Sequence, residues 1–142
     1  MAPPVTLWVC SACRRQFGKR NQSHDCEPAM SLEEYFSSGP VRERPIFDAV
    51  MAHLATVGPV HVEPVSVGIF LKRHRTFAEL RPMQRWVALS FSLSRRLDHR
   101  LIIRKVVPYG GRYFHVVNLR EPEDVDDEVG AALTEAYLNS PT

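Results

Sequence analysis

Apolar side chains recur at spacings of three and four residues in two stretches of the chain, and this period predicts two amphipathic helices. The first stretch runs from about 41 to 56 and ends before Gly58-Pro59. The second opens at the acidic segment 121–124 and ends at Asn139-Ser140-Pro141. A shorter helix is expected after Ser31, because Ser31-Leu32-Glu33-Glu34 has the pattern of a capping box.

Between these helices, apolar and polar residues alternate, which predicts β-strands. The alternation is clearest over 86–93. Residues 60–71 and 76–80 are expected as two further strands, joined by a hairpin tip at 72–75. Residues 102–107 and 112–119 are expected as another hairpin, whose two glycines supply positive φ angles for the turn. Because these strands follow one another with short turns, we predict an α+β fold, a mostly antiparallel sheet of four to five strands packed by helices.

The composition is typical of a globular protein with one principal domain. The chain has 142 residues, of which 44% are hydrophobic and 24% charged, and we divide it into a knuckle at 7–27 and an α+β domain at 31–140. No apolar run approaches the roughly 18 residues of a membrane helix, and the first residues lack the pattern of a secretory signal. Three cysteines, an odd number, argue against a disulfide framework. We therefore expect a cytoplasmic protein that makes no membrane contact and uses its thiols as metal ligands.

All the cysteines and one histidine lie within the first 26 residues, in the order Cys10, Cys13, His24 and Cys26. Thiolates and imidazole are the ligands of tetrahedral Zn²⁺ in structural sites, and four protein ligands leave no open position for a reaction. We expect a structural Zn²⁺ ion that supplies the folding energy of a segment too short for its own core. One residue separates His24 from Cys26, so the chain must bend there for both to reach one ion. The alternative is three buried or redox-active cysteines with an unrelated histidine.

The residues around these ligands carry a resemblance. Segments 8–17 and 21–26, with the sequences WVCSACRRQF and NQSHDC, resemble the zinc-ribbon-like segment that precedes some members of the family catalogued as domain of unknown function 5655. Segments 31–36, 73–78, 111–115 and 135–137 resemble the domain itself. The resemblance covers about residues 7–138 and departs from the expected pattern at Ser11-Ala12. The resemblance implies a metal-binding segment followed by the domain of that family. It implies no activity, because none is established for the family.

Charge is distributed unevenly along the chain. Residues 72–105 contain ten basic and two acidic residues, a net charge of +8, whereas 121–128 contain six acidic residues and no basic one. The hairpin tip and a strand histidine are the candidates for binding an anion, through Lys72, Arg73, Arg75 and His115. The alternative is an exposed polar turn on a solvated face, with His115 an ordinary strand histidine.

No phosphate-binding loop, metalloprotease motif or nucleophile elbow occurs in the sequence, so we assign no catalytic residue. The favoured function is a zinc-containing binding module that contacts nucleic acid or another polyanion through its basic residues. One alternative is a pocket for a small anionic ligand, or an enzyme, in which Arg73, Arg75 and His115 converge. Another is an adaptor whose knuckle docks a protein partner.

Overall fold

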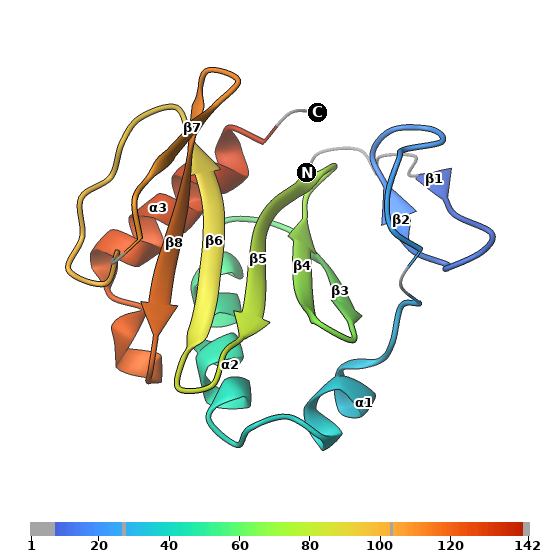
Figure 1. Ribbon diagram of the computed structural model, residues 1–142, viewed down its shortest axis with the longest axis horizontal. Coiled ribbons are helices and arrows are strands. Elements are labelled where there is room, and N and C mark those ends of the chain that lie inside the picture. The colour runs from blue at the N-terminus through green and yellow to red at the C-terminus, as the bar shows by residue number, and fades with distance from the viewer. Residues whose placement is uncertain (1–7, 27, 103, 141–142) are drawn as a thin grey trace.

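The computed structural model describes residues 8–140 apart from 27 and 103, and its largest element is a six-stranded antiparallel sheet (Figure 1). The strands lie in the order β3-β4-β5-β6-β8-β7. Their bounds are β3 His61–Val65, β4 Gly68–Lys72, β5 Thr76–Pro82, β6 Val87–Leu93, β7 Val107–Tyr109 and β8 Arg112–Leu119. The predicted α+β class and antiparallel sheet are confirmed, but the sheet has more strands than the four to five expected.

The additional strand arises within 60–71, which we predicted as one extended segment. The chain instead turns at Ser66 and Val67, so that β3 and β4 pair with each other. Val65 and Ile69 are fully buried, whereas Val67 between them is 45% exposed at the turn. The single-strand prediction was wrong because Val67 continues the apolar alternation of its neighbours although it lies at a turn.

The segment 94–106 also differs from expectation. We predicted a strand over 102–107, but only Val107 of that stretch belongs to β7, and Ile103 lies outside the described residues. Leu101 and Ile102 instead pack on the core from a loop. The turn between β7 and β8 is as predicted, since Gly110 and Gly111 have φ angles of 55° and 80°.

The helices follow the predicted order with one corrected start. α1 (Leu32–Ser37) begins with the expected capping box, and α2 (Glu43–Leu54) lies within the predicted range. The acidic segment that we expected to open the last helix forms the 3₁₀ turn η1 (Pro122–Asp124). α3 (Asp127–Leu138) starts after it, because the Asp126 carboxylate accepts the Val129 N–H at 2.9 Å and caps the helix.

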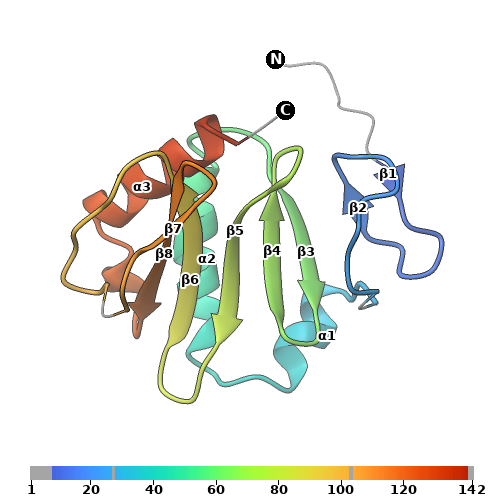
Figure 2. The ribbon, with the colours of Figure 1, turned by 45° about the horizontal axis from the view of Figure 1, so that its top comes forward.

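The two faces of the sheet have different environments. Helices α2 and α3 lie against one face, and in Figures 1 and 2 both are behind the strands. A cross-strand row formed by Leu71, Ala78, Phe91 and His115 points into this buried side. The adjacent row, Phe70, Glu79, Ser90 and Val116, points to the opposite face, which no helix of the described chain covers.

None of the helices in the described ranges is long and apolar enough to cross a bilayer.

Candidate metal centre and the adjoining cleft

The N-terminal part of the described chain is a knuckle built on a two-stranded antiparallel sheet, β1 (Trp8–Val9) and β2 (Gln16–Phe17). Between these strands the chain makes a tight turn that carries Cys10 and Cys13. The Cys10 N–H donates to the Arg15 carbonyl at 3.0 Å, and the Arg14 N–H donates to the Cys10 carbonyl at 2.8 Å. Arg14 has a positive φ of 66°, which closes the turn and directs both thiols to one side.

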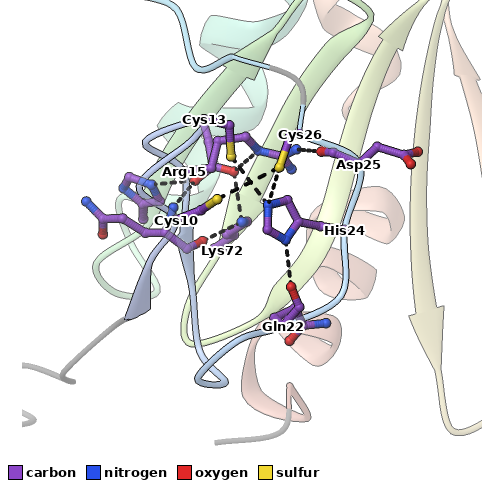
Figure 3. A network of polar contacts seen from close by, with 11 residues as sticks. Cys10, Cys13, Arg15, Gln22, His24, Asp25, Cys26 and Lys72 are labelled. Atoms are coloured by element: carbon purple, nitrogen blue, oxygen red, sulfur yellow. Dashed lines mark hydrogen bonds and ion pairs between the residues drawn. The ribbon is translucent and has the colours of Figure 1, made fainter.

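The three thiols and the His24 imidazole come together in the knuckle (Figure 3), with their ligand atoms within 4.8 Å of one another. The sulfurs of Cys10 and Cys26 are 3.9 Å apart, and His24 Nε2 is 3.4 Å from the sulfurs of both Cys13 and Cys26. Bond lengths of about 2.3 Å for Zn–S and about 2.0 Å for Zn–N separate tetrahedral ligand atoms by roughly 3.5–3.8 Å. The four predicted ligands therefore have spacings that suit a tetrahedral metal ion.

The bend expected between His24 and Cys26 is present. Residues 22–26 adopt no regular secondary structure, and both side chains reach the same point. His24 Nδ1 lies 2.6 Å from the Gln22 carbonyl, so this nitrogen carries the proton and Nε2 has the lone pair that a metal ion would bind. The histidine is thus held in the tautomer that coordination requires.

The electrostatics of the thiols favour a bound cation. The backbone amides of Cys13 and Ala12 lower the pKa of Cys10 to about 6, so this residue readily forms a thiolate. The pKa of Cys26 is raised, chiefly by its hydrogen bond with Cys10 and further by the neighbouring sulfur charges. A divalent cation would remove that repulsion and stabilise all three thiolates together.

Aromatic rings form the packing of the knuckle. Phe17 lies 4.1 Å from the His24 ring and 5.8 Å from the Trp8 ring, measured between centroids. Phe17 is also 4.0 Å from Lys72 Nζ, which lies over its ring and belongs to β4. Phe17 therefore connects the candidate metal ligands to the large sheet.

A buried carboxylate, Glu63 on β3, fixes the knuckle to the sheet. It is 2% exposed and lies 2.7 Å from Arg15 Nε and 2.8 Å from Lys72 Nζ. Its second oxygen accepts the Gln16 N–H at 2.9 Å and lies 3.1 Å from His61 Nε2. Burial would raise the pKa of Glu63, but these four partners together hold it well below its usual range.

The same network extends to the ligand loop. Arg15 donates from Nη1 to the carbonyl of Asp25 at 3.1 Å, and Asp25 is the residue between His24 and Cys26. Lys72 donates to the Gln16 carbonyl at 2.6 Å. The position of the metal ligands relative to the sheet therefore depends on a buried ionic cluster, Arg15, Glu63 and Lys72.

The four residues singled out for anion binding occupy different environments. Lys72 is 2% exposed and belongs to the ionic cluster. Arg73 lies over the Tyr137 ring at 4.7 Å and donates to the Tyr137 carbonyl. Arg75 is exposed at the hairpin tip. His115 is fully buried on the helix-covered face, where Nε2 accepts the Leu97 N–H at 2.8 Å. His115 therefore does not converge with Arg75, because the sheet lies between the helix-covered face and the knuckle.

A cleft of about 440 Å³ separates the knuckle from the open face of the sheet. Gly18 of the knuckle lies against the hairpin tip, and a Cβ there would be only 2.4 Å from the His74 carbonyl oxygen. The cleft is lined by Arg15, Phe17, Gly18, Gln22, His24, Asp25, Val65, Val67, Phe70, Lys72, His74, Arg75, Thr76 and Arg81. Knuckle and hairpin tip thus share one hollow, a proximity that spacing along the sequence does not reveal.

The residues of the ionic cluster were not singled out together from the sequence. Glu63 lies in the apolar segment Val62-Glu63-Pro64-Val65, and its partner Arg15 is 48 positions away. One feature of the sequence does indicate such a cluster: Glu63 is an acidic residue between apolar neighbours on a predicted strand, and a buried carboxylate needs a cation beside it.

Comparison with known proteins gives one match, to a protein family. A family model described as a domain of unknown function (DUF5655) matches residues 32–140, which span the α+β domain and exclude the metal ligands. No curated protein and no solved structure matches this chain. The chain belongs to the family of the domain of unknown function 5655, and it carries the Cys₃His knuckle in front of that domain.

Proposed function

We propose that this protein is a zinc-containing binding module that holds nucleic acid in the cleft between the knuckle and the sheet. The observation that carries the proposal is the cleft itself, which joins two basic parts of the chain. Zinc is the metal proposed because three thiolates and one imidazole at tetrahedral spacing match its structural sites. The three cysteines form no disulfide, which suits the reducing cytoplasm.

The cations of the cleft are of two kinds. Arg15 and Lys72 share the charge of Glu63 and serve mainly to hold the walls together. Arg75 and Arg81 are exposed, and the Glu79 carboxylate, 2.9 Å from Arg81, forms with it a surface pair of little strength. These two arginines are therefore available to phosphate groups.

The knuckle adds further positive charge at the rim. Lys19 and Arg20 are exposed and directly follow Gly18, which lines the cleft. His74 also lines it, and its buried Nδ1 has no hydrogen-bond partner among the described residues. Lys19 and Arg20 extend the positive surface of Arg75 and Arg81, which a phosphate backbone would neutralise with release of counterions.

The test is salt-dependent binding of a labelled oligonucleotide to the zinc-loaded protein, followed by fluorescence anisotropy from about 50 to 300 mM salt. We expect affinity to fall steeply with salt, and the double variant Arg75→Glu, Arg81→Glu to bind at least about tenfold more weakly with a shallower salt slope. Arg44→Glu on α2 is the matched control for the single variant Arg81→Glu, since each reverses one charge and the two arginines are 54% and 53% exposed. No binding by the parent protein at 50 mM salt would exclude the proposed function.

A further inference from the structure

Two further hollows adjoin the cleft, and each shares lining residues with it. A second hollow of about 310 Å³ shares Arg75 and Thr76 with the cleft. It is lined on the open face by Ser90, Ser92 and Phe114, and it reaches between the strands to Ala136 and Ser140 at the end of α3. A third of about 270 Å³ shares Arg81 with the cleft, and shares Glu79, Ser90 and Phe114 with the second. The three hollows are therefore neighbours, and the surface that they line between the knuckle and the β7–β8 hairpin is called the track.

The centre of the track is formed by small side chains of β6. Ala88, Ser90 and Ser92 alternate with the buried residues of that strand and point to the open face. They lie between the larger side chains of Glu79 and Arg81 on β5 and of Phe114 and Val116 on β8. From β4 to β7 the sheet is about 19 Å wide at the usual strand spacing of about 4.8 Å.

Two aromatic side chains border the track on the side away from the knuckle. Phe114 is 41% exposed although it lies in the interior of strand β8, and it lines both the second and third hollows. Tyr109 on β7 is 82% exposed and lines the second. Large rings left in water on a sheet face are suited to stacking with flat ligands.

Cations line the same hollows as these rings, and one of them, Arg112, also donates to the carbonyls of Ser92 and Asn139. The second and third hollows are lined by Arg75, Arg81, Arg104 and Arg112, and by one acidic residue, Glu79. Their net charge is therefore +3 from the described lining residues. This combination of exposed rings and arginines complements a strand that carries both bases and phosphates.

We propose that the track binds single-stranded nucleic acid, with bases stacked on Phe114 and Tyr109 and phosphates held by the surrounding arginines. This inference rests on the proposed function and specifies its ligand. A duplex hides its base faces within its own stack, so it would reach only the cations, whereas an unpaired strand offers base faces to the rings. At about 3.4 Å per stacked nucleotide, the track has room for on the order of five nucleotides.

The experiment compares fluorescein-labelled dT₁₅, U₁₅ and a 15-base-pair DNA duplex on the zinc-loaded protein at one salt concentration. We expect the single strands to bind about tenfold or more tightly than the duplex. Phe114→Ala should weaken single-strand binding about fivefold or more while leaving the duplex unchanged, and Phe114→Trp should retain it. Because Phe114 is substantially exposed, both variants should fold, and a thermal melt checks this.

The outcomes separate this inference from the proposed function. Equal binding of duplex and single strand, or Phe114→Ala binding like the parent, overturns the stacking track even if Arg75→Glu, Arg81→Glu weakens binding and the cleft proposal stands. Binding by dT₁₅ or by U₁₅ supports the track, and the two affinities tell which sugar is preferred. Absence of binding to every probe overturns both proposals.

Discussion

Removing the charge of Glu63 tests how the knuckle is attached. Glu63→Gln keeps the size and shape of the side chain but leaves Lys72 and Arg15 as buried cations, 2% and 6% exposed, without the carboxylate that pairs with both. Losing one partner of a buried ion pair costs about 3–5 kcal/mol, because the remaining charge is stranded away from water. The loss is a large part of the roughly 5–15 kcal/mol that stabilises a domain of this size.

The assay is urea unfolding of the zinc-loaded protein, followed by tryptophan fluorescence and by circular dichroism. Trp8 reports on the knuckle and Trp86 on the sheet, so Trp86→Phe protein isolates the knuckle signal. The matched control is Glu79→Gln, whose carboxylate is 24% exposed and pairs with Arg81 at the surface. We expect the control to lose about 1 kcal/mol or less.

The free energies of unfolding of the two variants decide the question. If Glu63→Gln loses no more free energy of unfolding than Glu79→Gln, the buried ionic cluster does not hold the knuckle to the sheet. A double variant, Glu63→Met with Lys72→Met, should recover part of the stability, since apolar groups of similar volume can replace a buried pair.

Further predictions concern acid stability, the loop before β7 and the metal ligands. The pKa of Glu63 is lowered in the folded protein, so its contribution to stability is present above the unfolded pKa of about 4.3 and is lost as the pH falls below that value. Urea titrations between pH 6 and 3 should therefore show that the free energy of unfolding falls more steeply in the parent than in Glu63→Gln. Parallel pH profiles would contradict this. His115→Ala should cost about 1–3 kcal/mol and speed hydrogen exchange at the Leu97 amide, which loses its acceptor; unchanged exchange would mean that His115 does not hold the loop. Cys26→Ser should lower zinc affinity sharply, measured by competition with a chelating dye, whereas Ser23→Ala should not; equal affinities would remove Cys26 from the ligand set.

Features that depend on neighbouring residues could be predicted from the sequence, and those that depend on distant partners could not. The ligand residues of the knuckle follow from residue type and spacing, and β6 follows from a strict alternation in which Val87, Leu89, Phe91 and Leu93 are buried. The turn at Gly110-Gly111 follows from the glycine pair.

Lys72 illustrates the opposite case. In sequence it begins a basic run that is typical of an exposed turn, yet its side chain is buried because Glu63 and the Gln16 carbonyl lie beside it. These partners belong to another strand and to the knuckle, so the charge pattern alone could not show which cation of the run is buried and which, like Arg75, is free.

The most direct test of the link between metal and function is the affinity of dT₁₅ for the zinc-loaded and the metal-free protein, with zinc content measured on the same samples. We predict one zinc ion per chain and, after chelation, at least about a tenfold loss of affinity that added zinc restores, because the metal-folded knuckle forms one wall of the cleft. Metal-free protein that binds dT₁₅ as tightly as the zinc-loaded protein would contradict this role of the knuckle.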